Sequence, residues 1–197
     1  LLAGGKGFIG SHLYSQLEVQ ASVASIGHGN CATEKKNINL DLANTNKVND
    51  FVANYDHFDV LIFLVGLAHA KGKGKDLPEF KKINYQTLVN LLLVLENNNK
   101  IPHKIIFSST ISVYGENIHQ NMYNEDSDKN PFSPYAVTKL EAEDYLLEHF
   151  AEKAWVLRFA PVYSPDFQLN INRRTQSGNW FYKVGNGSKK LSLCNLE

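Results

Sequence analysis

Short apolar runs alternate with longer segments of helical spacing along almost the whole chain. Residues 59–65 show this best, because they form a nearly unbroken apolar run, as in a strand buried on both faces. Strands are predicted at residues 1–3, 22–27, 37–40, 59–65, 104–109 and 155–160, and helices at 10–19, 45–54, 77–97, 134–151 and 170–183. This alternation predicts an α/β fold, a doubly wound parallel sheet with helices on both faces.

The first strand runs into a glycine-rich turn. Gly4, Gly7 and Gly10 are spaced by three, and residues with helical apolar spacing follow them. Glycines permit a tight turn and close backbone approach, and the free amides of a helix N-terminus attract a pyrophosphate. An ordinary glycine-rich turn is the alternative. The position between a strand and a helix favours a dinucleotide site.

Tyr135 and Lys139 lie four residues apart in a predicted helix and therefore share one helix face. A free tyrosine has a pKa of about 10, and a fixed cation nearby favours the phenolate and lowers that pKa. The pair can therefore transfer a proton near neutral pH. Because both residue types are common on helix surfaces, this spacing becomes specific only in combination with other features.

Two further strand ends carry candidate chemistry. The strand at 104–109 ends in Ser108, Ser109 and Thr110, and ligands of open α/β sheets bind at the carboxyl ends of strands. A turn or a helix cap is the alternative for these hydroxyls. The later strand, at 155–160, runs into a loop marked by Pro161 and Pro165.

Together and in this order, these four segments resemble the extended short-chain dehydrogenase/reductase family. The most similar branch is that of the NAD-dependent nucleotide-sugar epimerases and dehydratases, of the UDP-glucose 4-epimerase-like kind. Asp41-Leu42, residues 64–68 and Asn84 match as well, so the resemblance covers nearly the whole chain. It implies a Rossmann-type sheet that binds NAD(P).

The resemblance also implies roles for individual residues. Tyr135, Lys139 and Thr110 are the expected catalytic residues, with Tyr135 and Thr110 facing the sugar hydroxyl that is oxidised. Asp41 should meet the adenine, Asn84 should hold the neighbouring strand end in place, and Lys139 should also bind the nicotinamide ribose. The expected cofactor-binding residues are Gly4, Gly7, Phe8, Ile9, Gly10, His28, Asp41, Leu42, Leu64, Val65, Gly66, Asn84, Ser108, Tyr135, Lys139, Pro161 and Val162.

The chain departs from the family pattern at three places. NAD-binding members usually carry an acid at the end of the second strand, where it binds the adenosine ribose. Residues 25–30 contain no acid, and His28 with Lys35 and Lys36 could tolerate a 2′-phosphate, so NADP stays an alternative. Ser164 stands where relatives often carry glycine. Ile111 and Ser112 come after Thr110, where many dehydratases carry two acids, and this argues against dehydration.

The favoured activity is therefore epimerisation of a nucleotide sugar, at C4, through a 4-keto intermediate. An NADPH-dependent 4-keto-sugar reductase would use the same three residues, and the missing ribose acid favours it slightly. A catalytically idle cofactor-binding member of the fold is the third alternative, because fold alone does not establish function.

Composition excludes several other classes. Twenty Lys and Arg balance twenty Asp and Glu, so nucleic-acid binding has no electrostatic support. No apolar run approaches the roughly 20 residues that cross a membrane, and no signal-peptide pattern is present. Cys31 and Cys194 and the seven histidines show no metal-ligand spacing, so no metal site is expected. A cytoplasmic protein is the simple interpretation.

Two expectations concern the molecule as a whole. Residues 1–165 should form the NAD(P)-binding domain, and 166–197 the start of an incomplete substrate-binding portion, since the chain opens inside its first strand and relatives are usually longer. A homodimer is expected through the helices near 84–97 and 134–151, because relatives commonly pair through them and residues 88–95 are apolar nearly all round.

Overall fold

The computed structural model describes residues 1–28, 37–68, 76–115, 122–183, 185–186, 190 and 192–196. The chain divides into two compact units, Leu1–Leu157 and Arg158–Glu197, and each is described by itself.

The first unit is built on a parallel sheet of six strands in the order β3-β2-β1-β4-β5-β6. The strands are β1 (Leu2–Ala3), β2 (Ser25–Gly27), β3 (Asn37–Asn39), β4 (Val60–Phe63), β5 (Lys104–Thr110) and β6 (Ala154–Phe159), whose last residues open the second unit. The strand order reverses between β1 and β4, since the chain builds outward to β3 and then crosses back. Ligands of open α/β sheets bind at such a switch point, outside the carboxyl ends of the strands.

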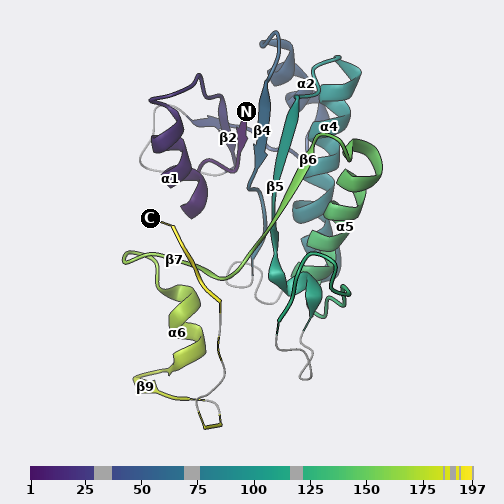
Figure 1. Ribbon diagram of the computed structural model, residues 1–197. Helices are drawn as coiled ribbons and strands as arrows, with labels where there is room; N and C mark the ends of the chain where they lie inside the picture. Colours follow the sequence, from purple (N-terminus) through teal and green to yellow (C-terminus); the bar gives the residue numbers. More distant parts are fainter. Residues whose placement is uncertain are drawn as a thin grey trace. The chain divides into compact units, whose positions relative to one another are not determined.

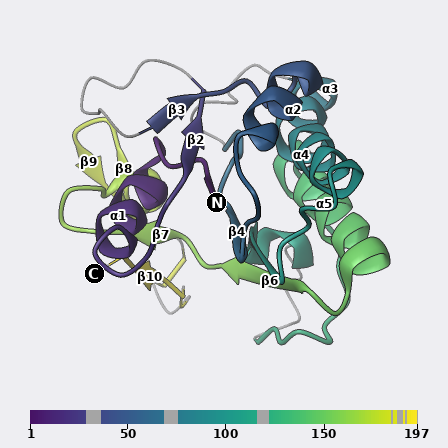
Figure 2. The same ribbon diagram turned by 90° about the horizontal axis from the view of Figure 1, so that it is seen from above.

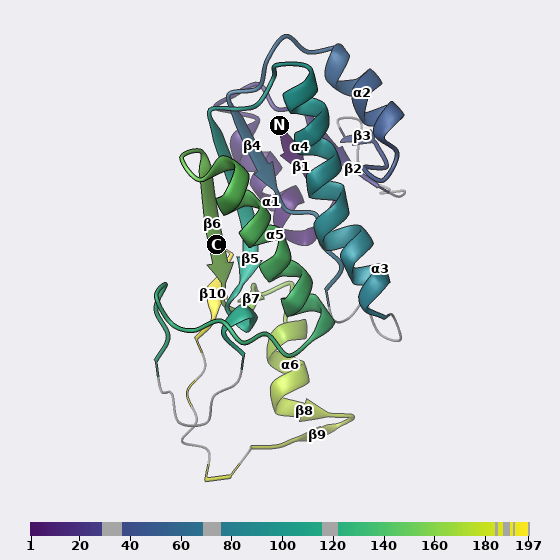
Figure 3. The same ribbon diagram turned by 90° about the vertical axis from the view of Figure 1, so that its right-hand side faces the viewer.

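Helices cover both faces of this sheet, as predicted. Helix α1 (Phe8–Leu17) lies on one side, and α4 (Thr87–Asn97) and α5 (Pro134–Phe150) lie on the other (Figures 1 and 2). Helices α4 and α5 run side by side along their face of the sheet (Figure 3). Helix α2 (Thr45–Ala53) packs against α4, and the short α3 (Leu77–Lys81) packs against α5.

Side-chain caps mark the starts of several helices. Asn44 accepts a hydrogen bond from the Lys47 amide at the start of α2, at 3.2 Å. Ser133 accepts one from the Ala136 amide at the start of α5, also at 3.2 Å, and Pro134 occupies the first turn. Such caps satisfy amides that have no partner inside the helix. They fix the residue at which α5 begins, and with it the position of Tyr135.

The core lies between the sheet and the layer of α2, α4 and α5. Apolar strand residues face apolar residues of α4, which is buried along most of its length, and Leu146 and Phe150 of α5 complete this layer. The most deeply buried members are Ala3, Ile26, Val48, Val52, Leu61, Phe63, Leu88, Leu91, Leu92, Leu95, Ile105, Phe107, Ala142 and Leu146.

Besides shifts of one or two residues at element ends, the structure differs from the predicted elements in three places. The second strand begins at Ser25 rather than at 22. The helix predicted over 77–97 contains a π-helical segment, η1 (Lys82–Gln86), between α3 and α4. Within the range predicted as a helix, 170–183, α6 (Leu169–Thr175) ends at Thr175, so the helical prediction is wrong beyond that residue.

A hairpin replaces the second half of that predicted helix. Strand β8 (Gln176–Ser177) pairs with β9 (Trp180–Phe181) in antiparallel register, and Gly178 in the turn has a φ of +59°. Glycine adopts this left-handed conformation without strain, and aromatic residues favour strands. The second unit also contains β7 (Val162–Tyr163), which pairs in parallel with β10 (Cys194–Asn195).

Within the part of the chain that the structure describes, no helix is long and apolar enough to span a bilayer.

Candidate active site

The three glycines of the first loop have different structural tasks. Gly4 has a φ of +93°, a backbone conformation that favours glycine, and its carbonyl accepts a hydrogen bond from the Gly7 amide at 2.9 Å. A Cβ on Gly10 would overlap the Gly4 carbonyl oxygen and lie 2.8 Å from the Cα of Gly5. Gly10 therefore permits α1 to pack closely against the loop.

Gly7 differs from the other two because it faces outward. Its φ is −74°, and a Cβ there would meet only the Gly4 carbonyl oxygen, at 3.2 Å. Gly7 is the N-cap residue of α1 and no side chain caps this helix, whose first turn holds Phe8 and Ile9. Uncapped amides beside a bare backbone fit the pyrophosphate of a dinucleotide.

This loop lies at the switch point of the sheet. A Cβ on Gly4 would lie 2.9 Å from the Leu64 carbonyl carbon and equally close to the Val65 nitrogen. The Leu64 amide donates to the Ala3 carbonyl at 2.8 Å, which ties the end of β4 to that of β1. The glycine loop and the predicted cleft residues Leu64 and Val65 therefore lie side by side, as a shared dinucleotide site requires.

Lys139 reaches the same strand ends from α5. Its side chain is 2% exposed, and its Nζ donates to the Ser108 carbonyl at 2.7 Å and lies 3.5 Å from the Val65 carbonyl oxygen. The Nζ also lies 4.6 Å from the centroid of the Phe107 ring. A Cβ on Gly66 would come within 3.3 Å of this Nζ, so the small residue leaves room for the ammonium.

Burial controls the charge of this lysine. Removal from water disfavours the ammonium and lowers the pKa of Lys139 to about 7, while the charge of Glu143 acts in the opposite direction. Lys139 can therefore change its protonation state close to neutral pH.

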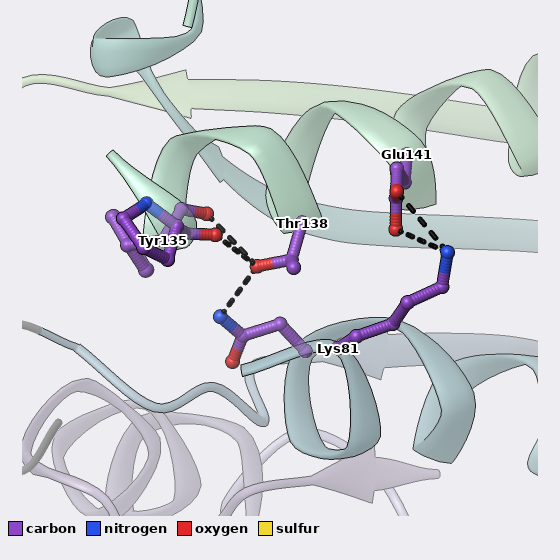
Figure 4. A network of polar contacts seen from close by, with 6 residues as sticks. Lys81, Tyr135, Thr138 and Glu141 are labelled. Atoms are coloured by element: carbon purple, nitrogen blue, oxygen red, sulfur yellow. Dashed lines mark hydrogen bonds and ion pairs between the residues drawn. The ribbon is translucent and has the colours of Figure 1, made fainter. Parts of the chain in front are cut away.

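Tyr135 lies in the first turn of α5, where a polar network fixes the backbone. Thr138 Oγ1 donates to the carbonyls of Pro134 and Tyr135, at 2.8 and 3.1 Å, and accepts from Asn84 Nδ2 at 3.1 Å (Figure 4). Asn84 is fully buried, and its Oδ1 accepts from the Leu67 amide at 2.6 Å. The network thus joins the start of α5 to the segment that comes after β4.

The structure also shows why Asn84 can reach both partners. It lies in the π-helical segment η1, inside the range predicted as one continuous helix, 77–97. Single π turns of this kind are frequent at functional sites.

The hydroxyls at the end of β5 point to three different partners. Ser108 Oγ donates to the Phe63 carbonyl at 3.1 Å, and Ser109 Oγ donates to Glu143. Thr110 is nearly buried, and its hydroxyl caps the 3₁₀ helix η2 (Ile111–Tyr114) by accepting from the Ser112 amide at 3.2 Å. Ser108 and Ser109 therefore have structural contacts, while Thr110 has a capping role besides any catalytic one.

The expected adenine-side residues lie after β2 and β3. Leu42 is buried, and its carbonyl accepts from Asn90 Nδ2 of α4 at 3.0 Å. Asp41 is exposed, with its carboxylate accepting from the Ala43 amide. His28 is exposed next to the end of β2, and Lys35 and Lys36 lie outside the described residues.

Pro161 and Val162 belong to the second unit, so their expected contact with the nicotinamide stays a prediction.

Sequence reasoning missed three buried polar residues that support the site. Thr138 and Asn90 fix backbone segments as described, and Glu143 is fully buried on α5. A usable signal existed for Glu143, because Tyr135, Lys139 and Glu143 recur at intervals of four on one helix face. No such spacing marks the other two, since Asn90 contacts Leu42 and Thr138 contacts Asn84, both distant in sequence.

Among the described residues, no group of three or more His, Cys, Asp or Glu side chains could hold a metal ion.

The strand order, the glycine loop at the switch point and the buried lysine at the ends of β4 and β5 define a doubly wound α/β protein of the Rossmann class. The chain belongs to the NAD dependent epimerase/dehydratase family, whose model matches residues 1–192. The predicted fold class and the family resemblance are thereby confirmed, and NAD, which the family description names, is supported as the cofactor.

The similar proteins include several UDP-glucose epimerases. An uncharacterized UDP-glucose epimerase of Bacillus subtilis strain 168 is 30% identical over an alignment of 183 positions, which covers 84% of this chain and 57% of that relative. A UDP-glucose 4-epimerase of Thermotoga maritima, solved with UDP-glucose, is 26% identical with a TM-score of 0.73, over 83% of this chain and 56% of that one. The Thermus thermophilus UDP-glucose 4-epimerase, solved with NAD, is 26% identical with a TM-score of 0.70, over 83% of this chain and 55% of that one.

The chain spans 57% of the length of the Bacillus relative and 58% of an Escherichia coli O157:H7 4-epimerase that acts on an undecaprenyl-linked sugar.

Proposed function

We propose that this protein is an NAD-dependent nucleotide-sugar epimerase that inverts C4 through a 4-keto intermediate. The single observation that carries the proposal is the buried Lys139, one helical turn after Tyr135, with its ammonium between the ends of β4 and β5. Family membership and the 4-epimerases among the similar proteins support the same activity.

In this proposal, the chain's residues hold the reactants and move one proton. The glycine loop and the N-terminus of α1 would hold the pyrophosphate of NAD, and Lys139 the nicotinamide ribose. Bound NAD supplies reversible acceptance of a hydride. Tyr135 takes the proton of the C4 hydroxyl and later returns it, and the nearby ammonium of Lys139 favours the phenolate that this requires.

The residues directly after Thr110 support epimerisation over dehydration. Elimination of water needs an acid and a base at the neighbouring carbons, whereas Ile111 and Ser112 here open η2. In this proposal Thr110 orients the sugar hydroxyl together with Tyr135. Inversion at C4 requires no acidic pair, since one hydroxyl proton and one hydride leave and return.

An NADPH-dependent 4-keto-sugar reductase is the alternative, and one observation favours it. Strand β2 ends in Gly27 and the exposed His28, without a carboxylate, and a Cβ on Gly27 would lie 3.2 Å from the Lys6 side chain. The ammonium of a lysine based at this strand end would suit the extra phosphate of NADP better than a carboxylate would.

The experiment combines cofactor identification with product analysis. The nicotinamide retained by the purified protein is identified after denaturation, and UDP-glucose and UDP-N-acetylglucosamine are tested for conversion to their 4-epimers. Retained NAD with epimer formation is expected. Exchangeable NADPH and consumption of a 4-keto sugar would establish the reductase, and absence of both activities would leave an idle cofactor-binding protein.

A further inference from the structure

We propose that Glu143 is a positioning residue that keeps Lys139 protonated and in place. The inference rests on the proposed function of Lys139 and extends it to a residue outside the Tyr135–Lys139 pair. Glu143 is fully buried on α5, one helical turn after Lys139 and two after Tyr135. A buried carboxylate is costly when no opposite charge balances it. Lys139, one helical turn away, supplies such a charge.

Neither neighbouring strand end brings a charge to Lys139. Strand β5 meets the lysine with the Ser108 carbonyl and the Phe107 ring, and the segment after β4 meets it with the Val65 carbonyl and Gly66. None of these groups titrates. Within the described residues, Glu143 is the charged group that raises the pKa of Lys139, against the larger effect of burial.

The same carboxylate also holds the strand that carries the acceptor for the lysine. Ser109 Oγ donates to Glu143 Oε1, and Ser109 directly follows Ser108, whose carbonyl accepts from Lys139 Nζ. Glu143 therefore acts on Lys139 in two ways: through its charge, and by fixing the end of β5. Both effects favour a protonated Lys139 that is held against the end of β5.

The test measures the titration of Lys139 directly. Protein with ¹³C-labelled lysine is titrated by NMR without cofactor or substrate, and the Lys139 resonance is assigned by its loss in Lys139→Met. Glu143→Gln removes the charge and keeps an oxygen that can accept from Ser109. The pKa of Lys139 is expected to fall by about one unit or more, the usual effect of losing an opposite charge in close range. The alkaline limb of the activity profile should move down in pH with it.

Glu141→Gln is the matched control. Glu141 lies on the same helix but is paired with Lys81, with Nζ–Oε2 3.1 Å, so this variant removes one carboxylate without touching the buried site. Its Lys139 titration and pH profile should match those of the parent.

An unchanged Lys139 titration in Glu143→Gln would overturn the proposal, even if the melting temperature fell, because the carboxylate would then serve packing alone. If the Gln variant does not fold, Glu143→Met provides the neutral side chain without a buried amide, and the same shift is expected. Since the titration needs neither substrate nor turnover, a shifted Lys139 in a protein without epimerase activity would reject the proposed function and leave this inference standing.

Discussion

At the scale of single residues, Lys139 is a cation that the fold removes from water, and stability must therefore depend on pH. Its pKa is about 7 in the folded protein and 10.5 in its ordinary state, so the unfolded chain binds more protons between these values. The free energy of unfolding therefore rises with pH between these two values. Below about pH 7 the lysine is charged in both states, so the folded protein bears the full cost of burying the ammonium.

Lys139→Met should remove this dependence. As pH rises from about 7 to 10.5, the free energy of unfolding of the parent should increase relative to that of Lys139→Met. The reason is that the parent loses its buried charge over this range, whereas the variant has none to lose. Urea unfolding of both proteins at several pH values measures this. Parallel pH dependences would show that the pKa of Lys139 is the same in the folded and unfolded states, as for a solvated lysine.

The glycine loop allows a matched pair of substitutions. Gly7 has an unstrained φ and faces outward, so Gly7→Val should fold, with its side chain blocking the backbone approach of the pyrophosphate. Calorimetry should then show NAD affinity reduced at least about tenfold, corresponding to roughly 1.4 kcal/mol.

Gly10→Ala should instead fail at the level of folding, since its Cβ would overlap the Gly4 carbonyl. Circular dichroism and thermal melting separate the two outcomes. A Gly7→Val protein that folds and binds NAD as well as the parent would contradict the assignment of this loop.

At the scale of secondary-structure elements, the Thr138 hydroxyl joins the start of α5 to the segment after β4. Thr138 donates to two first-turn carbonyls and accepts from Asn84, which in turn holds Leu67. The isosteric Thr138→Val leaves Asn84 without this acceptor, and an unsatisfied buried group costs about 1–3 kcal/mol.

Thr138→Val should therefore lower stability by about that amount and also slow turnover, because Tyr135 loses a constraint on its backbone. Denaturant unfolding and steady-state kinetics measure the two effects. Val137→Ala, on the same turn, is the control, since it leaves the polar network unchanged. Turnover in Thr138→Val equal to that of the control would show that the network serves stability alone.

The elements also show what sequence patterns could and could not provide. Continuous apolar runs predicted β4 and β5, and the Ser133-Pro134 start of α5 followed the usual capping chemistry. The π turn at Asn84 left no trace in the pattern, because a single extra residue in a helical stretch leaves most apolar spacing unchanged. Asn90 escaped notice because its partner Leu42 lies far away in sequence, and contacts of that kind emerge only when the strands are ordered. Glu143 was missed although it follows Lys139 by four residues on the same helix face.

At the scale of the whole molecule, exposed apolar residues on the helix layer bear on assembly. Leu93 of α4 and Leu147 of α5 are each 43% exposed on the helices that cover one face of the sheet. We propose, as the sequence suggested, that this face forms a homodimer.

Leu147→Glu should shift the protein from dimer to monomer in light scattering, because a charge would be buried in the interface. Val19→Glu is the control, since Val19 is 78% exposed and comes after α1 on the other side of the sheet. A parent protein that is monomeric at all concentrations, or a Leu147→Glu protein that stays dimeric, would contradict this proposal.

The central claim, that Tyr135 moves the C4 proton while a hydride leaves and returns on one sugar, has a direct isotopic test. Parent and Tyr135→Phe proteins are incubated with UDP-glucose and UDP-N-acetylglucosamine deuterated at C4, and the products are analysed by NMR and mass spectrometry. The parent should form a 4-epimer that retains deuterium at C4. Tyr135→Phe should bind NAD but form product about 10²–10⁴ times more slowly, the usual contribution of a positioned acid-base group. An epimer whose deuterium has exchanged with solvent, or near-parent turnover in Tyr135→Phe, would contradict the account.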